Sequence, residues 1–156
     1  MEERQETYDQ VIRRIEGLIA GESDPIAIMA TVVCELHHSF DHFDWTGFYR
    51  AMGPSVLKIG PYQGTHACLQ VLYERGVCGA SARLRTTQLV PDVRKFRGHI
   101  ACSASTRSEI VVPVITPAGK LVAVLDVDSH QLGAFNEVDQ VNLEKVCHMV
   151  GQVIGD

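Results

Sequence analysis

Apolar residues recur every three or four positions near both ends of the chain, which is the spacing of one helix face. The first such segment stops before Gly21, a residue suited to end a helix. A second helix is predicted to begin at Ser23 or Asp24, which suit an N-cap, with Pro25 in its first turn. Asn136 is predicted to cap the last helix. The predicted buried faces are Tyr8, Val11, Ile12, Ile15, Leu18 and Ile19; then Ile26, Met29, Ala30, Val33 and Leu36; and finally Val138, Val141, Val146, Met149, Val150 and Val153.

Strand patterns lie between these helices. Residues 43–49 are rich in aromatics, and residues 56–59 form a second short apolar run. Two β-branched runs, 109–116 and 121–128, are joined through Pro117-Ala118-Gly119, which is typical of a hairpin. Helices at both ends of a mostly antiparallel sheet predict an α+β domain. Residues 60–107 are less periodic, which predicts functional loops.

Composition limits the classes of protein to consider. The chain has 156 residues without a repeat or a linker, which predicts one domain spanning residues 1–156. The formal net charge of -5 argues against a nucleic-acid partner. No apolar run approaches the roughly 18 residues of a membrane span, and the acidic N-terminus lacks the features of a secretory signal. We therefore expect a cytoplasmic protein, in which five cysteines do not serve as static disulfides.

The hairpin carries candidate acidic groups. Asp126 and Asp128 are two residues apart and share one face of a strand. If Thr116 pairs with Gly119, Glu109 lies opposite Asp126 and the three carboxylates form one patch. Crowded carboxylates raise each other's pKa and need a metal ion, an ammonium group or a proton to offset their charge. A solvated strand end is the alternative, because a one-residue shift in register would move Glu109 to the other face.

Cysteines are the second candidate group. Cys68, Cys78 and Cys102 lie in a glycine-rich region, which favours redox chemistry. The absence of Cys-x-x-Cys pairs argues against a structural zinc site, so we expect no metal. Cys78 lies where a helix could begin, and a helix N-terminus would favour its thiolate. Cys34 and Cys147, inside helical patterns, are expected to be small buried side chains.

Aromatic residues supply a third feature. Trp45 and Tyr49 are four residues apart and would share one strand face with Gly47 between them. A glycine on that face leaves room for a neighbour. The pair therefore fits either ordinary core packing or the apolar wall of a small-ligand site.

Six segments of the chain resemble, in order and spacing, the motifs of the free methionine-(R)-sulfoxide reductases. These segments are Trp45-Thr46-Gly47-Phe48-Tyr49, Gly60-Pro61-Tyr62-Gln63-Gly64, Gly76-Val77-Cys78-Gly79, Gly98-His99-Ile100-Ala101-Cys102, Ser108-Glu109-Ile110-Val111-Val112-Pro113 and Leu125-Asp126-Val127-Asp128-Ser129. Proteins of that family are single GAF domains that reduce the free amino acid. The resemblance implies a GAF domain with a six-stranded antiparallel sheet flanked by helices.

The same resemblance implies roles for the candidate residues. Cys102 would be the catalytic cysteine, Cys68 its usual resolving partner and Cys78 a further thiol of the site. The family commonly has Asp after the catalytic cysteine, where this chain has Ser103. The substrate-binding residues would be Trp45 and Tyr49 in a methyl pocket, with the carboxylates of Glu109, Asp126 and Asp128.

The resemblance also implies the reaction and its partners. Free methionine (R)-sulfoxide would be reduced by a thiolate, a disulfide would form, and thioredoxin or a similar dithiol would reset the enzyme without a cofactor. GAF domains often pair through helices, which leaves a homodimer open. Two other functions stay open as well: a GAF module that binds a small molecule, and a thiol redox sensor without turnover.

Overall fold

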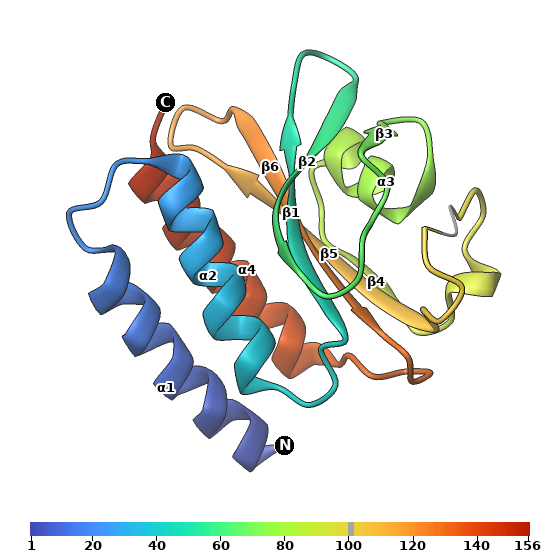
Figure 1. The fold of residues 1–156 in the computed structure, drawn as a ribbon, viewed down its shortest axis with the longest axis horizontal. Coiled ribbons are helices and arrows are strands. Elements are labelled where there is room, and N and C mark those ends of the chain that lie inside the picture. Colours follow the sequence, from blue (N-terminus) through green and yellow to red (C-terminus); the bar gives the residue numbers. More distant parts are fainter. Residues whose placement is uncertain (100–101) are drawn as a thin grey trace.

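The computed structural model describes residues 1–99 and 102–156. In this part of the chain, six strands form one antiparallel sheet in the order β3-β2-β1-β6-β5-β4 (Figure 1). The strands are β1 (Trp45–Ala51), β2 (Val56–Gln63), β3 (Gln70–Leu72), β4 (Gln88–Val90), β5 (Ser108–Ile115) and β6 (Leu121–Ser129). The predicted α+β class and six-stranded antiparallel sheet are confirmed.

Helices cover both faces of the sheet (Figure 1). The helices α2 (Pro25–Ser39) and α4 (Glu137–Ile154) pack on one face, and α1 (Glu2–Ile19) lies on the same side, packed against these two helices. On the other face lie the short helix α3 (Gly76–Leu84) and the 3-10 turn η1 (Val93–Lys95). The main core lies on the three-helix side, and the smaller core under α3 borders the candidate site.

Strand alternation divides the side chains between these two cores. Ile110 and Val112 of β5 face the three long helices, together with Leu125 of β6. Val111 and Val124 face α3. Because side chains alternate along a strand, every second residue of β5 and β6 is directed to the α3 side. Glu109, Asp126 and Asp128 belong to that set.

Helix ends follow the capping signals. The side chain of Asp24 accepts a hydrogen bond from the Ile26 backbone at 3.1 Å and caps α2. The side chain of Asn136 accepts from the backbones of Val138 and Asp139, and the Asp139 carboxylate accepts from the Asn136 backbone. This reciprocal pair is a capping box.

The predicted buried face of α2 is wrong in part. Ile26 is 50% exposed and Ala30 is also exposed, whereas Ile28 and Val32 are buried. Because α2 is apolar on most of its circumference, two overlapping sets of positions fit a helical face, and only packing against α1 and the sheet selects one. Cys34 is on the solvent side of α2, so the expectation that it is buried is also wrong.

Smaller differences occur in α1 and α4. Leu18 is 57% exposed at the end of α1, and Val141 is 43% exposed in α4. Leu143 and Cys147 are buried in place of Val141 on the inner face of α4. Burial of Cys147 agrees with its prediction as a small core residue.

Residues 60–107 hold more regular structure than predicted. They contain the second half of β2, the short strands β3 and β4, and the helix α3. The helix lacks large apolar side chains because it packs very closely: a Cβ on Gly79 would lie 2.6 Å from the Leu72 carbonyl oxygen. Small residues allow this contact but leave little hydrophobic periodicity to detect.

A buried polar network ties the N-terminal helix to the C-terminal one. The Asp139 carboxylate, which is fully buried, accepts hydrogen bonds from Tyr8 Oη at 2.7 Å and Arg4 Nη1 at 2.7 Å. His42 Nε2 lies 3.2 Å from the same carboxylate. Burial raises the pKa of Asp139, but hydrogen bonds from His42, the Asn136 backbone and Tyr8 outweigh it and hold that pKa below its usual value. None of the helices within residues 1–99 and 102–156 combines the length and apolarity needed to cross a bilayer.

Candidate active site

A cavity of about 550 Å³, measured to its open mouth, lies on the α3 side of the sheet. Its floor is formed by β1, β5 and β6, and its sides by α3 and the chain around Cys102. Seven of the eight residues predicted for the site line it: Trp45, Tyr49, Cys78, Cys102, Glu109, Asp126 and Asp128. The eighth, Cys68, is joined to the cavity through its bond to Cys102.

The carboxylates lie in two rows that cross the central strands. Asp128 of β6 lies between Trp45 of β1 and Glu109 of β5, and Asp126 lies in the next row beside Gly47. The three acidic side chains therefore share one face, as predicted. The alternative, in which these carboxylates lie at a solvent-exposed strand end, is excluded because Glu109 is only 7% and Asp126 only 5% exposed.

The predicted partner of Glu109 is wrong by two residues. Glu109 pairs with Asp128, not with Asp126. The Thr116 N–H donates to the Lys120 carbonyl, so Lys120 takes the position opposite Thr116, while Gly119 N–H donates to the Thr116 carbonyl within the turn. The pairing shifts again between Val114 and Ile115. Each irregularity moves the register by one residue, and two such shifts return the side chains to the expected face.

Burial and crowding control the charge of this cluster. Burial raises the pKa of Asp126 and of Asp128 well above the usual range, and the charges of neighbouring carboxylates raise both further. Burial also raises the pKa of Glu109, although hydrogen bonds from Asp126 and Asp128 oppose the increase. Among the described residues, Oδ1 of Asp126 and Oδ1 of Asp128 have no hydrogen-bond partner. The raised pKa values favour the protonated form of these carboxyls, and the two unpartnered oxygens offer acceptors to a cationic donor.

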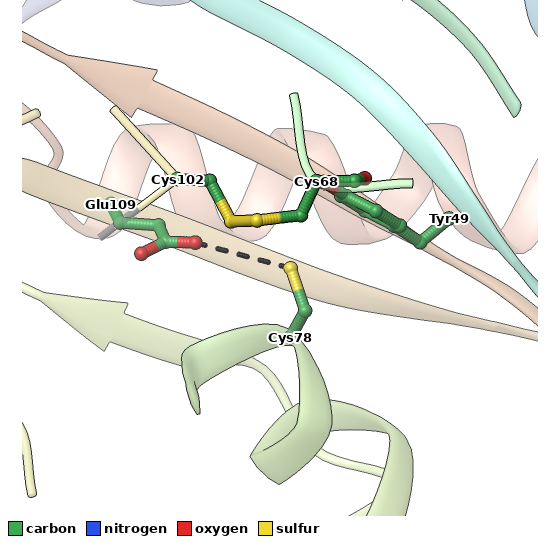
Figure 2. The surroundings of a disulfide bond; sticks show 5 residues. All are labelled: Tyr49, Cys68, Cys78, Cys102 and Glu109. Atoms are coloured by element: carbon green, nitrogen blue, oxygen red, sulfur yellow. Dashed lines mark hydrogen bonds between the residues drawn. A yellow bond between two sulfur atoms is a disulfide. The ribbon is translucent and has the colours of Figure 1, made fainter. Parts of the chain in front are cut away.

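Cys78 extends the cluster from the helix side. Its Sγ lies 3.9 Å from Oε1 of Glu109 (Figure 2). Burial raises the pKa of Cys78 well above the usual value, and the charges of Asp126, Glu109 and Asp128 raise it further. The expectation of a thiolate at this helix start is therefore wrong, because burial and three carboxylates outweigh the helix N-terminus.

A metal ion is one group that this donor set could hold. One ligand atom from each of Cys78, Glu109 and Asp126 lies within 4.8 Å of the others. All three groups have raised pKa values, so a metal would first have to displace protons. An ammonium group needs no such displacement, because it donates its own hydrogens to the carboxylate oxygens.

Cys68 and Cys102 form a disulfide at the mouth of the cavity (Figure 2). Their Cα atoms are 5.5 Å apart although 34 positions separate them in sequence. Both residues are half-buried. Tyr49 Oη donates a hydrogen bond of 3.1 Å to the Cys68 carbonyl, which ties this loop to β1. The cystine therefore shares the cavity with the three carboxylates and remains partly open to solvent.

Trp45 and Tyr49 share one strand face as predicted, but the space that Gly47 was expected to leave beside them is not empty. Trp45 stacks on Tyr49 with ring centroids 6.1 Å apart, and on Tyr62 at 5.4 Å. A Cβ on Gly47 would lie 2.5 Å from Trp45 Cη2 and 2.5 Å from the Cβ of Tyr62. The room that Gly47 leaves is thus filled by the Trp45 ring itself. Tyr62 was not predicted, although its pairing with Gly47 follows once β1 and β2 are aligned.

The cavity lining also includes residues that were not predicted for the site, among them the polar residues His66, His99 and Thr106. Burial lowers the pKa of His99, which favours the neutral imidazole. His99 belongs to the same family-like segment as Cys102, and its place in that segment was a usable signal. Ile100 and Ala101 of that motif lie outside the described residues.

Comparisons with known proteins agree with this geometry. The GAF domain family matches residues 2–155. The chain is 41% identical over 147 residues to GAF domain-containing protein A of Dictyostelium discoideum, covering 94% of this chain and 92% of that protein. It is 36% identical over 155 residues to the free methionine-R-sulfoxide reductase of Saccharomyces cerevisiae, covering 96% of this chain and 86% of the yeast protein.

A solved structure is similar over the same length. The X-ray structure of free methionine-R-sulfoxide reductase from Neisseria meningitidis, in complex with its substrate, superimposes with a TM-score of 0.89 at 37% identity. The match covers 94% of this chain and 87% of that one. The chain therefore belongs to the GAF-domain family of the free methionine-R-sulfoxide reductases.

Proposed function

We propose that this protein reduces free L-methionine (R)-S-oxide to L-methionine with electrons from an external dithiol. The observation that carries the proposal is that the Cys68–Cys102 cystine and a cluster of three carboxylates share one cavity. The cluster supplies both a proton and negative charge, and the cysteines supply two electrons. The names of the related proteins in yeast and Neisseria meningitidis support the same substrate.

Substrate binding uses the two properties of the carboxylate cluster. A sulfoxide becomes electrophilic when its oxygen is protonated or strongly hydrogen-bonded, and a carboxylic acid with a raised pKa supplies that hydrogen. The remaining negative charge and the unpartnered oxygens of Asp126 and Asp128 suit the ammonium group. Trp45 and Tyr49 provide the apolar surface for the S-methyl group.

The reduced cysteines perform the oxygen transfer. The Cys102 thiolate attacks the substrate sulfur, takes the oxygen together with a proton as a sulfenic acid, and releases methionine. The Cys68 thiol then attacks the Cys102 sulfur. A disulfide forms, and the oxygen leaves as water. Thioredoxin or a similar dithiol reduces the disulfide in the cytoplasm and is itself oxidised.

Turnover tests this proposal directly. The assay follows NADPH consumption by thioredoxin reductase and thioredoxin after addition of the separated R and S epimers of methionine sulfoxide. We expect NADPH oxidation with the R epimer only. No consumption with either epimer, although thioredoxin reduces the Cys68–Cys102 disulfide, would overturn it.

A thiol redox sensor is the second candidate, because the same half-buried disulfide would serve it. A sensor cycles with an oxidant such as peroxide and does not turn over methionine sulfoxide. A GAF module that only binds a small molecule would need neither cysteine. Turnover in the epimer assay separates the reductase from both alternatives.

A further inference from the structure

Charged residues are divided unevenly along this chain. Nine of the 14 Lys and Arg residues lie between positions 45 and 108, together with only two of the 19 Asp and Glu residues. The other five cations share the rest of the chain with seventeen acidic residues. Positions 45–108 include β1 to β4, α3 and η1, whereas α1, α2 and α4 belong to the acidic remainder (Figure 1). Although the net charge of the protein is -5, the segment that supplies most of the cavity lining carries seven more cations than acidic residues (9 − 2 = 7).

One main-chain hydrogen bond brings two arginines to the edge of the cavity. Gly76, which lines the cavity, donates from its backbone to the Gly98 carbonyl at 3.0 Å. Arg75 and Arg97 immediately precede these two glycines and are exposed. His99, the residue after Gly98, also lines the cavity.

A second main-chain bond adds three more cations. The Val93 backbone donates to the Arg107 carbonyl at 2.9 Å, so η1 with Arg94 and Lys95 lies beside Arg107. The one acidic residue in this loop, Asp92, accepts a hydrogen bond from the Arg94 backbone at 3.1 Å and caps η1. We call Arg75, Arg94, Lys95, Arg97 and Arg107 the basic rim. In the described part of the chain, no ion pair involves any member of it.

We infer that the basic rim is the docking surface for the protein that reduces this enzyme, and that this partner is a dithiol protein with an acidic surface around its reactive cysteines. The inference rests on the proposed function, which requires an external dithiol. A protein reductant must bring a thiolate sulfur to Cys68 or Cys102, and both are half-buried at the cavity mouth. Its surface must therefore cover the residues around that mouth.

Exposed apolar side chains close to Cys68 in the chain also support a docking surface here. Leu69, next to Cys68 in the chain, is 70% exposed, and Leu72 is 42% exposed. Docking interfaces commonly place apolar residues at the centre and charged residues at the edge. The opposite charges steer the encounter, whereas the apolar contact excludes water from the exchanging sulfur atoms.

Electron transfer at this surface follows ordinary thiol–disulfide exchange. The partner's thiolate attacks one sulfur of the cystine, the Cys68–Cys102 bond breaks, and the released sulfur takes a proton. The partner's second thiol then attacks the mixed disulfide and frees the other cysteine. Two electrons and two protons thus pass to this protein, and the partner leaves as a disulfide. Nearby cations stabilise the thiolates that attack and leave.

The test compares two reductants across a matched pair of variants. The first variant combines Arg94→Gln, Lys95→Gln and Arg97→Gln, whose side chains are exposed and make no hydrogen bond in the described residues. The control combines Arg13→Gln, Lys120→Gln and Lys145→Gln, which removes the same charge away from the rim. Turnover of methionine (R)-sulfoxide is measured with an acidic thioredoxin and with uncharged dithiothreitol, at low and high salt.

We expect the rim variant to lower kcat/KM for thioredoxin roughly tenfold at low salt and to lose most of the salt dependence of the wild type. Its turnover with dithiothreitol stays at the wild-type level, and the control variant matches the wild type with both reductants. An unchanged kcat/KM for thioredoxin overturns the inference. A raised KM for methionine sulfoxide with dithiothreitol also overturns it, since the rim would then bind the substrate carboxylate. Absence of dithiothreitol-driven turnover in the wild type would instead contradict the proposed function.

Discussion

Glu109 on β5 lies directly opposite Asp128 on β6, and Asp126 follows on the same face of the same strand. Like charges opposite one another weaken a sheet, and burial makes their ionisation costly. The hairpin therefore sacrifices stability to keep three acidic groups in one place. This trade is typical of a binding site and has measurable consequences.

Asp126→Asn removes a buried ionisable group with almost no change in shape. We expect the free energy of unfolding at pH 7 to rise by about 1 kcal/mol, because one of three competing carboxyl groups is gone. Methionine sulfoxide turnover should fall at the same time. Urea denaturation and the thioredoxin assay measure the two effects. The exposed Asp41→Asn serves as a control that changes neither, and a destabilised Asp126→Asn would contradict this account.

The stability gain from Asp126→Asn should also depend on pH. A carboxyl whose pKa is raised by folding binds more protons in the folded than in the unfolded state, so its contribution to stability declines as pH increases above the unfolded value of about 4. The difference in unfolding free energy between variant and wild type should therefore be smallest near pH 4 and grow toward pH 8. Denaturation curves across this range test it. A difference that stays constant with pH would show that Asp126 is ionised in the folded protein.

The two cysteines of the disulfide should separate into two kinetic roles. Cys102→Ser is expected to abolish turnover, because it removes the attacking thiolate while keeping the side-chain shape. Cys68→Ala should release about one methionine per enzyme in a single turnover and then stop, because oxygen transfer and resolution are separate steps. Methionine release is measured by chromatography. The exposed Cys34→Ser provides a control at the wild-type rate.

Substantial turnover by Cys102→Ser would transfer the nucleophile to Cys68 or Cys78. Peptide mapping after one turnover of the wild type should find Cys68 bonded to Cys102. A bond between Cys78 and Cys102 would give the resolving role to Cys78.

Cys78 should react slowly despite its place in the site. Its pKa is raised by burial and by three carboxylates, so little thiolate exists at neutral pH. In the reduced protein at pH 7, we expect iodoacetamide to alkylate Cys102 and the exposed Cys34 well before Cys78. Mass spectrometry of timed samples gives the three rates. Alkylation of Cys78 as fast as Cys102 would contradict the raised pKa.

The carboxylate cluster should restrict the enzyme to the free amino acid. N-acetylation of methionine sulfoxide removes the ammonium charge and adds little bulk. Breaking a buried charge pair on one side costs on the order of 3–5 kcal/mol, which corresponds to roughly two to three decades in kcat/KM. The thioredoxin assay with both compounds measures this ratio. Similar efficiencies would limit the carboxylates to polarising the sulfoxide oxygen.

The features best predicted from the sequence are those that depend on a few neighbouring residues. The cap of α2 was predicted at Ser23 or Asp24, and that of α4 at Asn136, because an N-cap depends on one side chain and the next few backbone groups. The structure has Asp24 and Asn136 in these positions. The side of the hairpin that carries Glu109 was also predicted. Its partner was not, because two irregularities near Thr116 and Ile115 depend on the geometry of the folded turn.

Sequence failed where packing makes the choice. The apolar positions of α2 fit more than one buried face, and contact with α1 and the sheet decided against Ile26. The Trp45 ring folds over Gly47 and stacks on Tyr62, an arrangement that strand alternation does not encode. The prediction of a thiolate at Cys78 failed for a similar reason. Its position at a helix start could be predicted from the sequence, but its closeness to the carboxylates across the cavity could not.

The buried Asp139 carboxylate has a consequence for folding during synthesis. It binds Tyr8, which lies 131 positions earlier in the chain. While the ribosome is still translating the middle of the message, α1 can already pack against α2, with the Tyr8 ring against Phe40, but the Tyr8 hydroxyl and Arg4 lack their acceptor. Only the emergence of α4 supplies the Asp139 carboxylate. A premature stop codon before Asp139 would therefore delete the last helix and also leave these two groups of the first helix without the partner that joins the two ends of the chain.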